Sequence, residues 1–206
     1  MIDIGSSTCK FGYAGADLPT GVFSGRTGVL RSEGAQGPAR SSTLVEPEAS
    51  YVVGPSATTF RPGMELRPPT DFGLYEDWDG MEAVWQYGFD ALSCDPREHP
   101  MLLSETPFSV MSQREKVAEV MFETFDVPAL YLARQPMLAA FSTGRASGIV
   151  VDLGHSCTRV TALYDGYIVQ SECAARHGWV RLEGGEEGSP SLSAWPRKNT
   201  PIHPLT

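Results

Sequence analysis

Two stretches of the chain alternate apolar and polar positions on both sides of a turn that contains glycine. The first, residues 2–15, has the sequence IDIGSSTCKFGYAG, and the second, residues 148–169, has the sequence GIVVDLGHSCTRVTALYDGYIV. Alternation with a period of two is typical of half-buried β-strands. Each stretch places the motif Asp-x-Gly at its turn, at residues 3–5 and 152–154, and Asp165-Gly166 favours a further tight hairpin turn. The pattern therefore predicts two matched β-hairpins.

Two amphipathic helices are predicted between these hairpins. Asp79 fits an N-cap because Glu82 follows three positions later, and Ser112 with Glu115 forms a second capping box. The second helix is expected to stop near Pro128. The apolar faces at helical spacing consist of Met81, Val84, Trp85, Phe89 and Leu92 in the first helix, and of Val117, Val120, Met121 and Phe125 in the second.

Short apolar runs between the helices predict strands at residues 101–104, 129–133 and 149–151. A third helix is expected to begin at Gln135-Pro136 and to end at Gly144, with Leu138 and Phe141 on its buried face. Strands that alternate with helices in this order indicate a right-handed α/β unit around a largely parallel sheet. Ligands of such sheets bind beyond the carboxyl ends of the strands.

The remaining segments have a different composition. Residues 16–50 are rich in Gly, Pro, Ser and Thr, which predicts short edge strands and an exposed loop at residues 32–50 with a disordered tip. Residues 170–206 contain four prolines, a Gly-Gly-Glu-Glu-Gly run and no periodicity, so they are expected to form a disordered tail. We expect residues 1–169 to form one lobe, within which residues 16–76 form a small outer lobe and loops.

Charge and cysteine spacing exclude several classes of function. The formal net charge of -9 and the absence of Lys and Arg clusters argue against a nucleic-acid or anionic-membrane surface. No apolar run approaches the roughly 20 residues of a membrane-spanning helix. The four cysteines form no Cys-x-x-Cys pair, so free thiols in a reducing compartment are expected. The first residues already form a predicted strand, so no signal peptide is expected, and a soluble intracellular protein is predicted.

The paired Asp-x-Gly turns suggest phosphate chemistry. A glycine turn between two strands lets backbone N–H groups point into a cleft, where they can hold phosphate oxygens. An aspartate beside those phosphates needs a divalent cation, or the water around it, between the two negative groups. Lys10 would add positive charge. The pattern alone fits two ordinary hairpins with turn glycines at least as well.

The chain between the hairpins adds further matches, and with them it resembles the actin family. The matching segments are Trp78-Asp79-Gly80-Met81-Glu82, Glu98-His99-Pro100, Arg114-Glu115-Lys116, Met121-Phe122-Glu123-Thr124-Phe125, Pro128-Ala129-Leu130-Tyr131 and Ser142-Thr143-Gly144-Arg145. The resemblance covers residues 1–169 in order and is of the divergent kind associated with male germ cells. It implies an α/β, actin-like (ribonuclease H-like) ATPase lobe with paired phosphate-binding hairpins and a small outer lobe.

The resemblance also implies roles for individual residues. Asp3 and Asp152 would orient the water shell of a metal ion bound with Mg-ATP or Mg-ADP, and Gln135 would position the attacking water. The positions that match the phosphate-binding hairpins are Gly5, Ser6, Ser7, Lys10, Gly154 and Ser156.

The sequence departs from the family pattern at one position of the first phosphate hairpin, and two further departures weaken the prediction of catalysis. Ser7 stands where a glycine is usual, and its Cβ would crowd a phosphate. His155 replaces an acidic residue, and Arg159 replaces a histidine with a side chain that cannot shuttle a proton. ATP hydrolysis is therefore expected to be weak or lost. Taken alone, His155 fits an exposed turn residue, and Arg159 fits either a solvated strand residue or a phosphate contact.

A family chain would continue into a second, homologous half, and residues 170–206 do not resemble it. We therefore expect exposed apolar surface where that half would dock. The first hypothesis is a cytoskeletal or structural protein of the cytoplasm that acts through protein contacts, with actin or other cytoskeletal proteins as partners and with vestigial nucleotide binding. The alternatives are a Mg-ATP-binding ATPase or nucleotide switch, and a truncated product without a stable fold.

Overall fold

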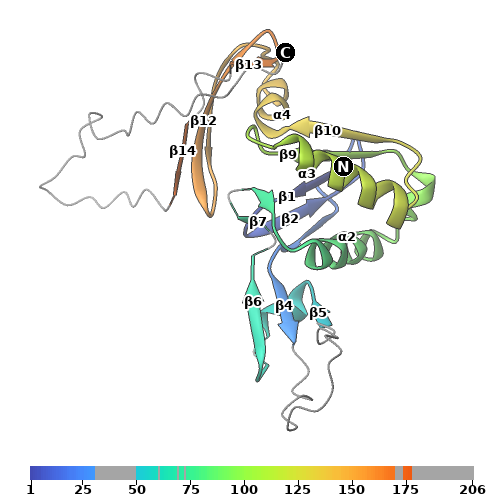
Figure 1. Cartoon of the computed structure of the whole chain (residues 1–206). Helices are drawn as coiled ribbons and strands as arrows, with labels where there is room; N and C mark the ends of the chain where they lie inside the picture. The colour runs from blue at the N-terminus through green and yellow to red at the C-terminus, as the bar shows by residue number, and fades with distance from the viewer. Residues whose placement is uncertain (31–49, 60, 69, 72, 170–173, 178–206) are drawn as a thin grey trace, which may run out of the picture.

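The computed structural model describes residues 1–30, 50–59, 61–68, 70–71, 73–169 and 174–177. Its elements form three groups (Figure 1). A central group contains the N-terminal strands with helices α2 and α3, a small sheet around β4 extends from one side, and a further sheet around β12 stands beside helix α4. The hairpins predicted at the two ends of the lobe belong to two different sheets.

The central sheet has five strands in the order β10-β9-β1-β2-β3. Its strands are β1 (Ile2–Ile4), β2 (Thr8–Phe11), β3 (Gly21–Ser24), β9 (Met101–Glu105) and β10 (Leu130–Arg134). Strands β1, β9 and β10 run parallel, as predicted, whereas β1, β2 and β3 form an antiparallel meander. The strand predicted at residues 149–151 does not join this sheet, because it pairs with its own hairpin partner instead.

Helix α2 (Trp78–Leu92) buries the face that its sequence predicts. Met81, Val84 and Trp85 are fully buried against the central sheet. The predicted N-cap was wrong, because the N-cap lies two residues earlier: Asp77, not Asp79, accepts the hydrogen bond from the backbone N–H of Gly80, at 3.0 Å.

Helix α3 (Met111–Glu119) continues into a π-helical turn, η2 (Val120–Thr124). The capping-box prediction was wrong here, since Val110 occupies the N-cap position and Ser112 lies inside the first turn. The predicted buried face is confirmed: Val117, Val120, Met121 and Phe125 all belong to the core cluster shared with α2 and the central sheet. A short 3-10 helix, η1 (Pro96–Glu98), leads from α2 toward β9.

The third predicted helix is α4 (Gln135–Ser142), which begins with Pro136 in its first turn, as expected. Gly144 follows it with a φ of +70°, which favours glycine after a helix end. Its buried residues are Pro136 and Ala140, so the expected burial of Phe141 was wrong, and that ring is about half exposed. None of the helices in the described residues is long and apolar enough to cross a membrane.

Short elements form the segment predicted as an outer lobe. A three-stranded sheet consists of β4 (Thr27–Leu30), β5 (Ser50–Val52) and β6 (Met64–Arg67), and it is accompanied by α1 (Pro55–Thr58) and by the pair β7 (Thr70–Asp71) and β8 (Leu74–Tyr75). Strand β3, inside the predicted range 16–76, pairs with β2 of the central sheet. The loop prediction for residues 32–50 lies almost entirely outside the described residues.

The last sheet contains β11 (Gly148–Leu153), β12 (Cys157–Tyr164), β13 (Tyr167–Ile168) and β14 (Ala174–His177). Asp165 and Gly166 connect β12 to β13 with φ angles of +48° and +80°, the backbone that an Asp-Gly hairpin turn requires. The tail prediction was wrong for Ala174–His177, because these residues pair with β12 along Cys157–Val160. The rest of the predicted tail lies outside the described residues.

Candidate phosphate-binding cleft between two hairpins

The β1–β2 and β11–β12 hairpins have the same turn geometry. The backbone N–H of Gly5 donates to the carbonyl oxygen of Thr8, and the N–H of Gly154 donates to the carbonyl oxygen of Cys157, each at 3.0 Å. A Cβ added at either glycine would lie 2.9 Å from that same carbonyl oxygen. Both turns therefore exclude a side chain at this position, and the sequence echo corresponds to a structural repeat.

The two hairpins face one cleft of ≈ 360 Å³. All the residues predicted for the site line it, namely Asp3, Gly5, Ser6, Ser7, Lys10, Gln135, Asp152, Gly154 and Ser156. The structure thus brings together residues from the two ends of the lobe. The size and the polar lining suit a phosphate-bearing group better than an apolar ligand.

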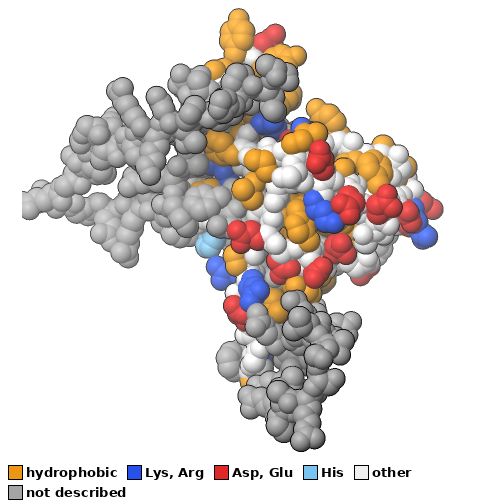
Figure 2. All heavy atoms as spheres, in the orientation of Figure 1, with side chains coloured by type: hydrophobic (Ala, Val, Ile, Leu, Met, Phe, Trp, Pro, Cys, Tyr) orange, Lys and Arg blue, Asp and Glu red, His pale blue; other side chains and the backbone are white. Residues whose placement is uncertain are grey.

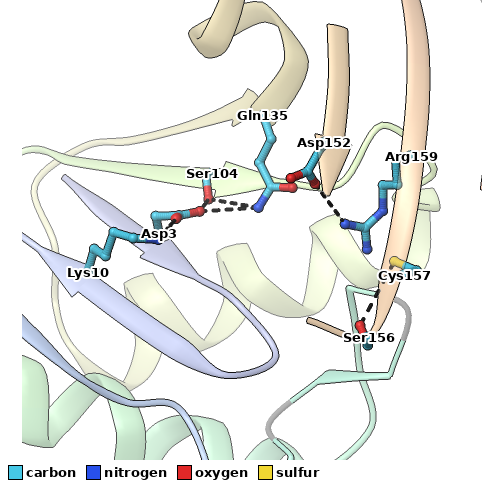
Figure 3. A network of polar contacts seen from close by, with 8 residues as sticks. All are labelled: Asp3, Lys10, Ser104, Gln135, Asp152, Ser156, Cys157 and Arg159. Carbon is cyan, nitrogen blue, oxygen red and sulfur yellow. Dashed lines mark hydrogen bonds and ion pairs between the residues drawn. The ribbon is translucent and has the colours of Figure 1, made fainter. Parts of the chain in front are cut away.

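A row of polar side chains runs across the floor of the cleft (Figure 3). The carboxylate of Asp3 accepts hydrogen bonds from Ser104 Oγ at 2.5 Å and from Gln135 Nε2 at 3.2 Å, and Lys10 Nζ lies 3.0 Å from its other oxygen. Gln135 also donates to Ser104 Oγ at 3.4 Å. Gln135 is thereby held at the start of α4 with its amide directed into the row, where the resemblance places it. Its role in positioning water stays a prediction.

The pKa of Asp3 is lower than usual even though burial opposes its ionisation. Burial alone would raise this pKa, but hydrogen bonds from Ser104 and Lys10, the charge of Lys10 and the Gln135 amide together outweigh it. The ionised form is therefore the one that the fold stabilises. Because the pKa is lower in the folded than in the unfolded chain, this stabilisation is present above the unfolded pKa and is lost as the pH falls through the folded value.

The lowered pKa of Asp3 predicts how the effect of Ser104→Ala on stability depends on pH. The variant removes a donor to an ionised group, so we expect it to lower the free energy of unfolding by about 1.5–3 kcal/mol at pH 7. The difference from the unmodified chain should shrink as the pH falls below about 4 toward the lowered pKa of folded Asp3, because the carboxylate that Ser104 stabilises then becomes protonated. Urea denaturation at a series of pH values measures it. Ser142→Ala is the control, since that hydroxyl donates to an uncharged carbonyl in α4; a Ser104→Ala difference that does not change with pH would contradict the prediction.

Arg159 is neither solvated nor peripheral, which corrects one of the two interpretations of this residue. It is 8% exposed and its Nη1 lies 3.3 Å from Asp152 Oδ2, directly across the β11–β12 ladder. Its guanidinium lines the cleft next to Gly73, where an added Cβ would lie 2.8 Å from Nη2. The sequence alone leaves open whether Arg159 is a solvated strand residue or a phosphate contact. Its place in the alternation Cys157, Arg159, Thr161, Leu163, all four of which are buried, was the available signal.

His155 lies at the edge of the cleft and is exposed, as predicted for a turn residue, but it also contacts a distant segment. Its Nε2 is 3.2 Å from Arg26 Nη2, at the connection between β3 and β4. Ser104 is a second residue that sequence reasoning missed, since nothing in a short apolar strand indicates which of its polar residues will face a ligand.

The carboxylates of the cleft do not fit the expected hydrated divalent cation well. Asp3 and Asp152 each face a basic side chain, and Glu105 at the rim is paired with Arg114 at 3.1 Å. Among the described residues no three His, Cys, Asp or Glu side chains gather into a metal-binding group. A cation held through water needs uncompensated negative charge nearby, and these pairs have largely neutralised it.

The fold and the cleft define a class: α/β proteins in which two glycine-turn hairpins from different sheets face each other across one polar cleft. Comparison with known proteins places the chain within that class, because the family profile for actin matches residues 1–177. The chain belongs to the actin family. The match extends past residue 169, where the predicted resemblance ended, and includes β14.

Curated relatives give the same result. The chain is 40% identical to "Actin-related protein 4" of Arabidopsis thaliana over 186 residues, and 36% identical to "Actin-related protein 4" of Oryza sativa subsp. indica over 193 residues. These alignments cover 82% and 84% of this chain but only 42% and 44% of the relatives. The chain thus spans less than half the length of these relatives. They give no support to the germ-cell subgroup, which stays a prediction.

Proposed function

We propose that this protein is an actin-like protein that acts through contacts with other proteins, and that its cleft binds the phosphates of a nucleotide. The observation that carries the proposal is the repeat of one hairpin geometry on the two sides of a single cleft, with a basic side chain on each. ATP or ADP is the nucleotide that the resemblance implies. Location in the cytoplasm and the cytoskeleton, with actin-type partners, is part of the same proposal.

Exposed apolar surface supports the protein-contact part of the proposal. Ile149, Val151 and Leu153 point to one face of β11 and are 72%, 57% and 74% exposed. Contiguous exposed apolar side chains of this kind mark protein interaction surfaces in soluble proteins. In contrast, Figure 2 shows Lys and Arg side chains scattered among acidic ones on the face in view, without a basic patch that would suit nucleic acid.

Hydrolysis is expected to be weak, although one observation favours the alternative of an ATPase. Gln135 projects into the cleft beside Asp3, as a water-positioning residue would. However, Arg159 cannot accept a proton, and its guanidinium is paired with Asp152. Release of phosphate from ATP at the rate of an intact actin-family member would favour the ATPase over the proposed function.

The proposal predicts that nucleotide stabilises the chain and that Lys10 is needed for this. With Mg²⁺ present, ADP at a hundredfold excess over its Kd should add about 2.7 kcal/mol to the free energy of unfolding, visible as a raised melting temperature. Lys10→Ala should weaken ADP binding at least tenfold, because it removes a charged donor to phosphate. Lys116→Ala is the matched control, since that lysine pairs with Glu119 on the surface of α3. A melting temperature of the unmodified chain that ADP leaves unchanged would refute nucleotide binding.

A further inference from the structure

We propose that the cleft binds the phosphates of its nucleotide without a divalent cation, and that Arg159 supplies the positive charge from the second hairpin as Lys10 does from the first. The inference rests on the proposed nucleotide-binding function and names the residues that recognise the phosphates. It follows from a second feature that the two hairpins share in addition to their turn geometry, namely the positions of their charged side chains.

Each hairpin carries an acid–base pair at equivalent positions. In the first hairpin Asp3 of β1 lies directly opposite Lys10 of β2, and in the second Asp152 of β11 lies directly opposite Arg159 of β12. In both hairpins the basic residue follows the acidic residue by seven positions. Lys10 Nζ lies 3.0 Å from Asp3 Oδ2, and Arg159 Nη1 lies 3.3 Å from Asp152 Oδ2. Arg159 is therefore the structural counterpart of Lys10, the residue that the sequence already assigns to phosphate.

The pairs are arranged symmetrically across the cleft. Figure 3 shows Lys10, Asp3, Gln135, Asp152 and Arg159 in a row, so that a basic side chain lies at each end and the two carboxylates lie between. The four charges of this row sum to zero. A phosphate group at either end of this row would meet a cation, which the neighbouring carboxylate holds in place.

The side chain of Arg159 is buried at the cleft, and the strand pairing fixes its position. Its side chain is 10% exposed, compared with 46% for Lys10, and the hairpin register fixes it opposite Asp152. Gly73 leaves room for its Nη2, since a Cβ there would lie 2.8 Å away. A planar guanidinium held in this way can donate two parallel hydrogen bonds to one phosphate, which a lysine cannot do.

The same pairs disfavour a hydrated divalent cation. Such an ion would have to lie among carboxylates that already face Lys10 and Arg159, and it would be repelled by both. The position where the family pattern has a further acidic residue is His155, whose ring faces Arg26 at 3.2 Å. Positive charge that a metal ion would bring is thus already provided by the chain itself.

The test is calorimetric titration of ADP into the full chain, once with excess Mg²⁺ and once with EDTA. We expect the two Kd values to agree within about twofold. A Kd at least tenfold weaker in EDTA would overturn metal-independent binding while leaving the proposed function intact. Absence of binding in both buffers would overturn the proposed function, and this inference with it.

A variant pair assigns the effect to Arg159. Arg159→Gln should weaken ADP binding at least tenfold in EDTA, whereas Arg97→Gln, which removes an equivalent charge from an exposed pair with Asp95 away from the cleft, should leave the Kd unchanged. Equal affinity of Arg159→Gln and the unmodified chain would refute the role of Arg159. If burial of Arg159 makes the glutamine variant fail to fold, Arg159→Lys keeps the charge but not the paired donors and should still weaken binding in EDTA, while the comparison of Mg²⁺ with EDTA on the unmodified chain decides metal-independent binding.

Discussion

Replacing Trp85 with alanine should lower the free energy of unfolding by about 3–5 kcal/mol, the cost of deleting a large aromatic side chain from a packed core. Trp85 is fully buried in α2, and its ring meets those of Tyr75 and Phe125 edge-on, with centroids 5.9 and 6.3 Å apart. It therefore joins α2 to β8, which precedes it, and to Phe125 at the end of η2, which lies 40 residues further along the chain. Since domains are typically stable by only 5–15 kcal/mol, the variant should be close to unfolding at 37 °C.

Urea denaturation followed by circular dichroism measures this loss without relying on tryptophan fluorescence. Trp85→Phe is an informative companion, because Trp85 Nε1 is buried without a hydrogen-bond partner among the described residues, and phenylalanine removes that orphan donor while keeping a ring. It should cost much less than alanine. Tyr167→Ala, at a position 77% exposed, should change stability by less than about 0.5 kcal/mol. A Trp85→Ala loss under about 1 kcal/mol would contradict the assigned core.

The buried faces of α2 and α3 could be predicted from the sequence, but the first residues of these two helices could not. The helical spacing of apolar residues alone identifies Met81, Val84 and Trp85 as buried, because only one face of a helix can pack against a sheet. The N-cap depends on a contact far away in the sequence: the hydroxyl of Tyr51 donates to Asp77 Oδ1 at 2.9 Å and holds the carboxylate that caps Gly80. The local capping-box pattern favours Asp79, because Glu82 follows it by three positions, and it contains no information on the contact with Tyr51 that selects Asp77.

The cleft was predictable for a different reason. A turn glycine and the acid before it are local features, so the Asp-x-Gly echo identified both hairpins and the site residues that they carry. The sequence did not identify the residues that other elements contribute to the cleft, such as Thr70, Ser104 and Gln113. Which sheet a hairpin joins is decided by long-range pairing, and β11 was accordingly assigned to the wrong sheet. Arg159 was undervalued because an arginine within an alternating strand usually faces solvent. Its burial depends on Asp152 opposite and on the space left by Gly73.

The turn glycines of the two hairpins should respond differently to substitution, although their geometry is the same. Gly5→Ala and Gly154→Ala each place a Cβ 2.9 Å from a backbone carbonyl oxygen, so the turn must open and its hydrogen bond must lengthen. Gly5 lies between Ile4 and Cys9, which are buried in the core cluster, and its substitution should cost about 1–3 kcal/mol. Gly154 follows Leu153, which is 74% exposed, so the second hairpin can move at a smaller cost.

The effects of Gly5→Ala and Gly154→Ala on nucleotide binding should not parallel their effects on stability. If both turns direct their N–H groups at the same phosphates, both variants should weaken ADP binding by about tenfold or more, and Gly154→Ala should do so while its melting temperature stays near that of the unmodified chain. Ser6→Ala and Ser156→Ala lie in the same turns and add no atoms, so they serve as controls for stability. Normal ADP affinity in Gly154→Ala would show that the β11–β12 turn takes no part in binding. Loss of affinity without loss of stability would instead show that this turn, on a sheet separate from the core, contributes its backbone to the ligand.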